Sequence, residues 1–256
     1  RPTGAGSSAA GARMEHALYQ DLYDLEDAHW WHVRKRAVCL ALLRRFAPAD
    51  RPDILDIGCG TGKNVEAFGD LGIAWGVDSS PEAVRFCAAR GLARIRQEPA
   101  EATSFADAAF DAVTLLDVLE HTDDAAVLRE ARRLLRPGGA LVVTVPAYRW
   151  MWSRWDEAVH HRRRYGQREL RRLLEAGGFQ PLKLSHLHAL LVIPAWLVRM
   201  VKSRLFPSAE YPSDFRLSSP LVNRLLLALS GVEARLLLRW SVPFGLTLVA
   251  VARKEA

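Results

Sequence analysis

Three closely spaced glycines beside an acidic residue are the most chemically informative feature of the sequence. The glycines are Gly58, Gly60 and Gly62. They follow the apolar segment 53–57, and glycines at alternate positions after a strand let the backbone turn tightly and approach a ligand closely. Asp56 stands two residues before the first glycine. Because a carboxylate repels a diphosphate and attracts an ammonium group, this position favours a cationic ligand.

The spacing of the glycines also differs from that of a dinucleotide-binding loop. Such loops have the pattern Gly-x-Gly-x-x-Gly, but Lys63 occupies the place of the third glycine in this chain. The methionine moiety of S-adenosyl-L-methionine (SAM) carries an ammonium group that Asp56 would attract. Asp78, 20 residues after Gly58, can accept hydrogen bonds from ribose hydroxyls, a feature that SAM and NAD proteins share. The sequence therefore favours SAM, with NAD as the alternative.

The elements that must position these residues alternate between strands and helices. Strands are expected at residues 53–57, 73–77, 93–96, 110–116, 140–145, 180–185 and 246–253. Helices are expected at 14–46 (two helices), from the glycine loop to about 71, from Pro81 onward, and at 125–135, 168–176 and 221–240. Arg-Pro-Gly-Gly at 136–139 predicts a stop and a turn. The alternation predicts an α/β protein with a doubly wound, mostly parallel sheet.

Several motifs together resemble the successive motifs of class I SAM-dependent methyltransferases. They are the glycine run Ile54–Gly62, Asp78, Phe110–Val113, Asp117–His121 and Leu135–Gly139. The resemblance covers about residues 50 to 185 and is specific in combination. It implies a Rossmann-like seven-stranded sheet whose last strand, here 246–253, is antiparallel. N-terminal helices and a helical insertion before the last strand would be added to that sheet.

The resemblance also implies how the cofactor would lie. Asp56 and the glycines would line its methionine end, and Asp78 would contact its ribose. The residues after the fourth strand, 117–119, would lie near its sulfonium. Relatives often carry Asp or Asn where this chain has Pro99, so adenine recognition would fall to the two residues that follow. The implied cofactor-binding residues are Asp56, Gly58, Cys59, Gly60, Gly62, Asp78, Ser79, Ala100, Glu101, Asp117, Val118 and Leu119.

The segment 146–165 holds the residues that we predict for catalysis. Methyl transfer from a sulfonium needs an aligned nucleophile and, where necessary, removal of its proton. His161 is the predicted general base, followed by His160, because imidazole takes up a proton near neutral pH. Asp156 completes the predicted catalytic group.

The same segment resembles the substrate-facing region of a bacterial subgroup of methyltransferases linked to glycan or natural-product biosynthesis. That subgroup also tends to carry an N-terminal His-Trp-Trp sequence, as at residues 29–31. The arginines could hold a carboxylate or a phosphate through paired hydrogen bonds. The predicted acceptor-binding residues are Tyr148, Trp152, Arg163, Arg164, Tyr165, Trp31 and Arg34. The alternatives are a surface loop with solvated arginines, and N-terminal aromatic residues that belong to the core.

Asp117, Glu120 and His121 form a second constellation. Their acid-x-x-Glu-His pattern resembles the metal-binding motif of small-RNA 2′-O-methyltransferases and of ubiquinone-pathway O-methyltransferases. A divalent ion there could lower the pKa of a substrate hydroxyl, and His160 or His161 would have to complete the site. Alternatively these side chains brace the turn after the fourth strand, as in metal-free relatives. We favour this alternative and expect no metal.

The chain divides into a core with additions at its start and near its end. Residues 1–13 are expected to be a disordered tail, 14–47 a helical lid, and 48–186 with 241–254 the SAM-binding core. Residues 187–240 are expected to be a helical insertion that ends in a basic amphipathic helix. That helix could form a cap, a dimer interface, a peripheral membrane contact or a cover over a lipid-like substrate.

The charge is distributed unevenly. Residues 1–128 hold 13 Lys/Arg and 20 Asp/Glu, which give a net charge of −7. Residues 129–256 hold 22 Lys/Arg and 9 Asp/Glu, which give a net charge of +13. The basic half suggests an anionic partner or a solvated arginine-rich surface. The three cysteines are widely separated, and their spacing forms no metal-ligand or redox pair. This favours a location in the reducing cytoplasm, and the protein could also associate with a membrane.

Three functions are compatible with these features. The favoured one is an O-directed methyltransferase acting on a small-molecule, glycan, lipid-linked or natural-product acceptor. The second is an RNA methyltransferase that uses the basic half, ranked lower because no aromatic RNA-recognition motif is present. The third is a non-catalytic module that binds SAM or NAD.

Overall fold

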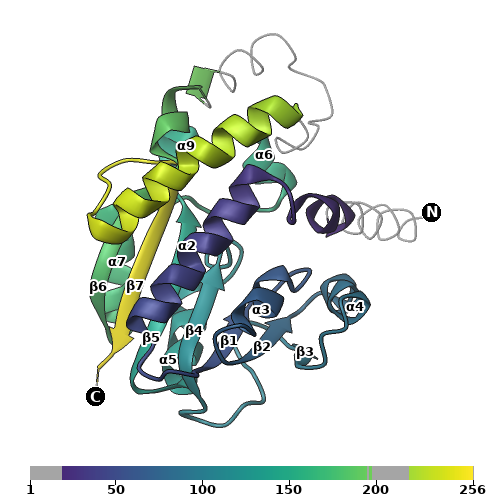
Figure 1. The fold of residues 1–256 in the computed structure, drawn as a ribbon. Helices are drawn as coiled ribbons and strands as arrows, with labels where there is room; N and C mark the ends of the chain where they lie inside the picture. Colours follow the sequence, from purple (N-terminus) through teal and green to yellow (C-terminus); the bar gives the residue numbers. More distant parts are fainter. Residues whose placement is uncertain (1–18, 195, 198–218, 256) are drawn as a thin grey trace, which may run out of the picture.

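Seven strands form one mixed sheet in the order β3-β2-β1-β4-β5-β7-β6. The computed structural model describes residues 19–194, 196–197 and 219–255, so the expected tail lies outside the described residues. β7 is antiparallel to β5 and β6, and the other paired strands are parallel (Figure 1). The predicted Rossmann-like sheet with an antiparallel last strand is confirmed.

Most of the bounds lie close to the predicted ones, but β5 begins earlier than predicted and α6 was not predicted. The strands are β1 (Asp53–Ile57), β2 (Ile73–Asp78), β3 (Ile95–Gln97), β4 (Phe110–Leu116), β5 (Leu135–Pro146), β6 (Phe179–Leu187) and β7 (Thr247–Lys254). The helices are α2 (Trp30–Phe46), α3 (Lys63–Phe68), α4 (Pro81–Ala89), α5 (Asp124–Leu134), α6 (Arg154–Ala158), α7 (Gln167–Ala176) and α9 (Pro220–Arg239), with short 3₁₀ turns η1 (Arg149–Met151) and η2 (Ala189–Leu191). Residues 19–25 are also helical, so the N-terminal region has two helical segments as expected.

Helices cover both faces of the sheet and bury its central strand completely. All seven residues of β4 are buried, which explains why its sequence is almost continuously apolar rather than alternating. Buried side chains of α5 and α7 pack on one face with Val113 and Leu115. Buried side chains of α2, α3 and α9 pack on the other face with Ala112 and Leu116.

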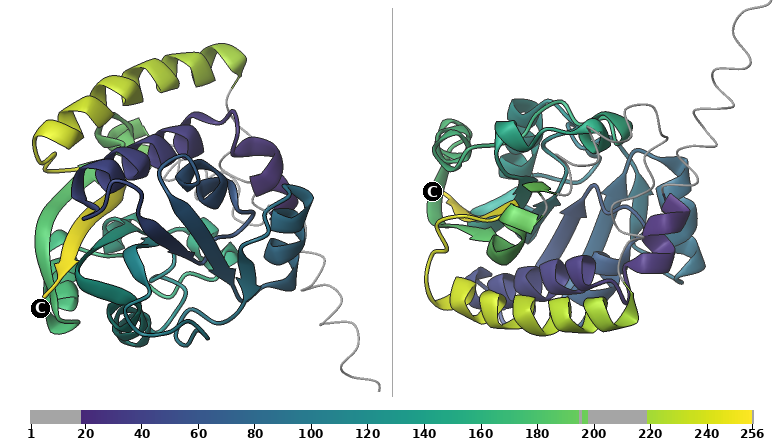
Figure 2. Two further views of the ribbon diagram at one scale, coloured as in Figure 1. Left: turned by 60° about the horizontal axis from the view of Figure 1, so that its bottom comes forward. Right: turned by 90° about the horizontal axis from the view of Figure 1, so that it is seen from above.

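α2 and α9 lie side by side and run in the same direction across that second face (Figure 2). Asn223 holds their N-terminal ends together: its Oδ1 accepts from Trp30 N at 2.9 Å, and its Nδ2 donates to Ala28 O at 2.9 Å. Near the other ends, Arg45 Nη1 donates to Leu238 O at 2.7 Å. α9, the last part of the expected insertion, is thus joined to α2 near both of its ends.

The predicted turn at residues 136–139 is wrong, because these residues lie inside β5. Phe110 pairs with Leu135 and Ala112 pairs with Ala140, so two residues along β4 correspond to five along β5. Gly138 adopts a φ of +77° within this bulge. A bulge accommodates extra residues while the chain stays in the sheet. The predicted stop is right, because α5 ends at Leu134, but an irregularity within β5 follows it in place of a turn.

No helix among the described residues is long and apolar enough to cross a membrane.

Candidate active site

The glycine loop connects β1 to α3 and folds back onto β2. Gly58 N and Cys59 N both donate to Val77 O, at 2.8 and 2.9 Å. Gly58 has a φ of +71°, and a Cβ atom there would lie 2.5 Å from Val118 Cγ2. Backbone conformation and packing therefore both require glycine at this position.

Asp78, the last residue of β2, sets the shape of this loop. Its Oδ2 accepts from Gly60 N at 2.8 Å and its Oδ1 accepts from Ser80 N at 2.9 Å. Asp78 is thus hydrogen-bonded to the same glycine loop that Asp56 precedes.

Asp56 is buried near the end of β1. Its Oδ1 accepts a hydrogen bond from Thr114 Oγ1, while its Oδ2 is buried with no hydrogen-bond partner among the described residues. Burial raises the pKa of Asp56 to about 7. An unsatisfied buried carboxylate oxygen is costly, and a cationic ligand would relieve that cost.

Lys35 of α2 reaches the residue that follows β4. Its Nζ forms an ion pair with Asp117 Oδ2, and Thr144 Oγ1 donates to Asp117 Oδ1 at 2.8 Å. Burial lowers the pKa of Lys35, but the adjacent Asp117 carboxylate outweighs burial and raises it overall. Asp117 adopts a left-handed backbone with a φ of +58°, so the sheet edge carries a fixed charge pair where the predicted sulfonium position lies.

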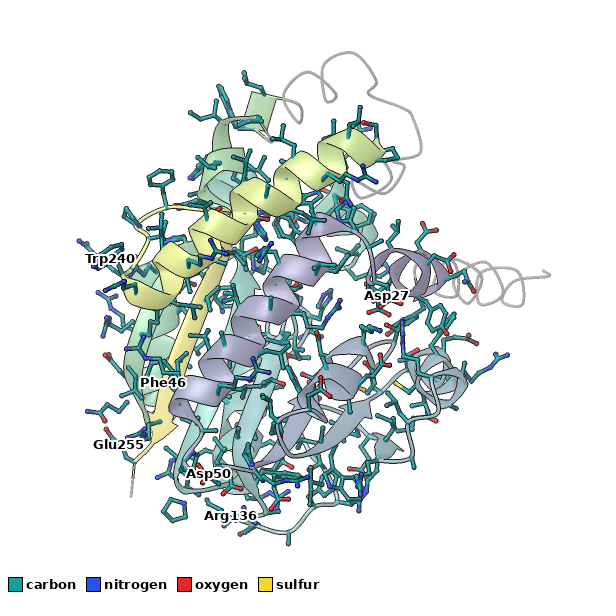
Figure 3. All side chains as sticks on the ribbon, viewed as in Figure 1. Asp27, Phe46, Asp50, Arg136, Trp240 and Glu255 are labelled. Atoms are coloured by element: carbon teal, nitrogen blue, oxygen red, sulfur yellow. The ribbon has the colours of Figure 1, made fainter. Side chains whose placement is uncertain are left out.

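The N-terminal segment is attached to the glycine loop by charged side chains. Glu26 accepts from Thr61 Oγ1 and forms an ion pair with Arg90. Asp27, labelled in Figure 3, lies 2.7 Å from Lys63 Nζ. These contacts place the predicted lid against the loop that precedes α3.

Asp156 is the centre of a buried polar network in the segment after β5. Its Oδ1 lies 2.8 Å from His161 Nδ1 and accepts from Arg164 Nε at 2.7 Å. Its Oδ2 accepts from Ser153 N at 2.8 Å. Burial raises the pKa of Asp156, but the hydrogen bonds from His161 and Arg164 more than reverse this and hold it well below its usual range. An ionised, immobile carboxylate therefore orients the His161 ring, as in catalytic dyads and triads.

The other side of His161 faces the residues that follow β4. The rings of His121 and His161 meet edge to face with centroids 4.7 Å apart. Glu120 is fully buried, and neither of its carboxylate oxygens has a hydrogen-bond partner in the described part of the chain. Burial raises the pKa of Glu120 well above its usual range and lowers the pKa of His121 to about 4.

Glu120, His121 and His161 each offer one ligand atom, and these atoms lie within 4.8 Å of one another. Two imidazoles and one carboxylate are a donor set for a divalent transition metal. The bond from His161 Nδ1 to Asp156 is also the outer-shell contact that metal-bound histidines commonly have. Asp117 is not a member of this group, and its carboxylate is held by Lys35 and Thr144.

Comparison with known proteins points to one family. Residues 55–143 match the family described as "Methyltransferase domain". An uncharacterized protein of Mycobacterium tuberculosis is 33% identical over 184 residues, which cover 68% of this chain and 61% of that protein. A ubiquinone biosynthesis O-methyltransferase of Xanthomonas oryzae pv. oryzae is 37% identical over 99 residues, 36% of this chain and 41% of that protein.

A solved structure resembles the whole fold. It is the 1,6-didemethyltoxoflavin-N1-methyltransferase of Burkholderia thailandensis with bound 1,6-didemethyltoxoflavin and S-adenosylhomocysteine. The TM-score is 0.55 at 19% identity, and the match covers all of this chain and 93% of that one. The residues that match the family, 55–143, include the glycine loop, Asp56 and Asp78. The chain carries a class I SAM-dependent methyltransferase domain.

SAM is the cofactor of this methyltransferase domain. The chain spans about three fifths of the length of the M. tuberculosis relative and about two fifths of the Xanthomonas enzyme. The roles of individual side chains in the domain therefore remain predictions that rest on their geometry.

The cofactor-side predictions fall into three kinds of position. Asp56 and Asp78 border the glycine loop, while Ser79 and Glu101 are exposed on the loops after β2 and β3. Val118 packs against Gly58. Leu119 and Cys59 are buried in the two hydrophobic clusters, and Ala100 packs on the edge of one of them.

Three predicted acceptor-binding residues have structural roles in the methyltransferase. Arg164 is buried and bonds to Asp156 and Ala147 O. Tyr165 is fully buried and its hydroxyl donates to Asp124 at 3.2 Å. Arg34 points to α9, where its Nη2 donates to Leu227 O at 2.8 Å. The polar groups of these three side chains already bond within the protein, and their roles in binding an acceptor stay predictions.

The remaining predicted residues of this region differ in how much of them is accessible. Arg163 pairs with Asp124 and Glu169. Trp152 is 40% exposed, and Tyr148, with a φ of +61°, stacks on His186. His160 is exposed, so His161 alone of the two adjacent histidines is held inside the site.

His188 was not singled out from the sequence, and it lies against Trp31, a predicted acceptor-binding residue. It follows the carboxyl end of β6, adopts a φ of +65°, and stacks on Trp31 with ring centroids 4.0 Å apart. Its ring is buried, and neither nitrogen has a partner among the described residues. Burial lowers the pKa of His188 to about 3, so the ring is neutral. Its position just after a strand was a usable signal, but the strand was predicted to end two residues too early.

Lys35 was also missed, although its spacing carries a signal. It stands four residues after Trp31 and four before Cys39, on the helix stripe that packs against the sheet. A lysine on an otherwise apolar stripe indicates a buried charge partner.

Proposed function

We propose that this protein transfers the methyl group of SAM to an oxygen atom of a small-molecule acceptor. The acceptor class that we propose is a glycan, a lipid-linked intermediate or a natural-product intermediate. The observation that carries the proposal is the Asp156–His161 pair, because a histidine oriented by a buried carboxylate can remove a hydroxyl proton as the methyl group is transferred. The O-directed activity named for the Xanthomonas relative is compatible with this choice.

The proposed division of labour follows the sheet edge. Asp56, Asp78 and the glycine loop hold SAM, and the Lys35–Asp117 pair lies beside the methionine end. The acceptor lies between His161 on one side and the Trp31–His188 stack on the other. Two aromatic rings with a neutral, unpartnered imidazole suit an acceptor that has an apolar body and a polar group.

A divalent cation is an alternative to a free histidine base, and the Glu120–His121–His161 group is the observation that favours it. The buried carboxylate without a partner and the two imidazoles fit such an ion. When bound, the ion would lower the pKa of an acceptor hydroxyl. In either case Asp156 holds the His161 ring in place.

The test is methyl transfer from SAM to hydroxylated acceptors in small-molecule and lipid extracts, with the product identified by mass spectrometry and NMR. Transfer to oxygen that His161→Ala abolishes, while SAM affinity is unchanged, supports the proposal. Transfer only to nitrogen or to RNA would refute it. Calorimetric titration with SAM and with NAD tests the cofactor-binding module separately from transfer.

Chelation separates the two catalytic options. Activity that is lost with EDTA and restored by a divalent ion, together with about one ion per chain in the active protein, supports the metal. Activity that is indifferent to chelation supports the free base.

We also propose a cytoplasmic location, since the three cysteines are free and buried.

A further inference from the structure

The outward face of α9 carries a stripe of large apolar side chains. Its members are Leu221, Leu225, Leu229, Val232 and Leu236, which are 76, 58, 41, 55 and 44% exposed. Their spacing of three or four residues places them along one side of the helix. A contiguous apolar stripe of this kind on a surface indicates an interaction site.

The inward face of the same helix has a different composition. The buried positions of α9 are Ser230, Glu233, Ala234 and Leu237, and Gly231 lies against the guanidinium of Arg34. Four of the eight leucines of α9 therefore project away from the body of the domain, and they are Leu221, Leu225, Leu229 and Leu236. An ordinary surface helix has the opposite arrangement, with its apolar stripe toward the core.

The charges beside this stripe are all positive. Arg224, Arg235 and Arg239 are exposed on α9. Within α9, every residue of which the structure describes, the one acidic residue is Glu233, which is buried and accepts from Ala189 N at 2.7 Å. Leucines flanked by arginines, with no exposed acid among them, complement an apolar phase that has an anionic border.

Further apolar side chains outside α9 are exposed as well. Trp240, labelled in Figure 3, follows α9 and is 61% exposed, and Phe244 is 53% exposed. Leu190 and Ile193 are 60 and 69% exposed, in the segment that the Ala189–Glu233 bond attaches to α9. Tryptophan is enriched where proteins meet the headgroup region of a bilayer.

We propose that α9 docks the domain onto an anionic lipid bilayer, with the helix axis in the plane of the surface. A second copy of this chain fits the face less well, because a symmetric contact would bring the three arginines close to their own copies with no exposed acid on α9 to pair with them. RNA fits the arginines but leaves the leucine stripe exposed to water. Docking does not depend on which acceptor is methylated.

Vesicle co-sedimentation of the full chain tests this proposal. We expect binding to phosphatidylcholine vesicles that contain phosphatidylglycerol, weaker binding to pure phosphatidylcholine, and weakening by salt. Replacing all three arginines (R224Q, R235Q and R239Q together) should weaken binding by about a hundredfold, since each basic residue near an anionic surface contributes about fivefold. The apolar variant (L225Q, L229Q and V232Q together) should weaken it by about tenfold or more.

The matched control removes three exposed arginines from α7 (R168Q, R171Q and R172Q together). This variant has the same change in net charge and should keep vesicle binding. Circular dichroism and SAM titration of each variant check that the domain still folds.

If the α7 and α9 arginine variants bind vesicles equally well, the proposal is overturned, because vesicle binding would then depend on net charge and not on α9. So would an absence of vesicle binding by the unsubstituted chain. A dimer in analytical ultracentrifugation that the apolar variant disperses, without vesicle binding, would show a subunit interface instead. RNA binding lost in the α9 arginine variant, without vesicle binding, would show a nucleic-acid surface.

Discussion

The Nδ1 atom of His161 lies 2.8 Å from Oδ1 of Asp156, a carboxylate with no exposure to solvent. Because Arg164 and Ser153 hold the same carboxylate, its position is determined by the protein rather than by the ligand. The imidazole therefore presents its other nitrogen to the site in a defined orientation.

His161→Ala is expected to lower kcat by about 10²- to 10⁴-fold, because it removes the group that would take up the acceptor proton. The SAM dissociation constant, measured by calorimetry, should not change. His160→Ala is the matched control, since that neighbour is exposed, and it should keep full turnover. A fully active His161→Ala protein would eliminate both the base and the metal-ligand role of this residue.

Asp156→Ala is expected to destabilise the domain by about 3–5 kcal/mol, because it leaves Arg164 buried without its partner. In a protein of this size, that corresponds to a fall in Tm of roughly 10 °C. Thermal unfolding followed by circular dichroism measures it. Glu157→Ala, which changes the exposed neighbour, should leave Tm nearly unchanged. Equal Tm values for the two variants would contradict a structural role for the buried network.

Gly58→Ala is expected to weaken SAM binding by about tenfold or more. The added methyl group would lie 2.5 Å from Val118 Cγ2, and the φ of +71° is strained for any residue with a Cβ. Gly166→Ala is the comparison, because Gly166 has a φ of −93° and no atom of the described residues lies within 4 Å of its new methyl group. Calorimetric titration should give the parent affinity for this second variant.

SAM affinity is expected to rise with pH between about 5.5 and 7.5. Burial raises the pKa of Asp56 to about 7, so the carboxylate is largely protonated at the lower pH and ionised above 7. The ionised form attracts the ammonium group of SAM, whose own pKa near 7.7–8.0 sets the upper limit of the rise. Calorimetric titrations across this range measure it.

Asp56→Asn should flatten this pH dependence, whereas Asp70→Asn, at an exposed position, should preserve it. A parent protein whose SAM affinity is constant from pH 5.5 to 7.5 would contradict contact between Asp56 and the cofactor's ammonium group.

His188→Phe is expected to stabilise the ligand-free domain and to raise KM for the acceptor. The substitution keeps the stack on Trp31 but removes two buried nitrogens that have no partner within the described chain, which relieves a cost of about 1–3 kcal/mol. Thermal unfolding measures the first effect and steady-state kinetics the second. A higher Tm with unchanged KM would make the residue structural and remove it from the acceptor site.

Local sequence patterns were sufficient to predict the sheet and the cofactor loop. The strands at 53–57 and 110–116 match β1 and β4 in their bounds, because continuous apolar runs next to glycine or polar residues have few other stable arrangements. The spacing of Asp56, Gly58 and Asp78 was likewise informative, since a loop that turns directly after a strand is determined by nearby residues.

Which polar side chains bond within the protein became clear from the three-dimensional packing alone. Arg34, Arg164 and Tyr165 look available in the sequence, yet each bonds to a group on another segment. Lys35 contacts Asp117, which lies 82 residues further along the chain. His188 stacks on Trp31, from which it is separated by 157 residues. Strand formation depends on hydrophobic periodicity along the chain, whereas the pairing of charges and the burial of polar atoms depend on which distant segments meet. Local patterns along the chain therefore suffice for the fold and the cofactor, whereas the residues that meet at the sheet edge depend on how α2, α6 and β6 pack around it.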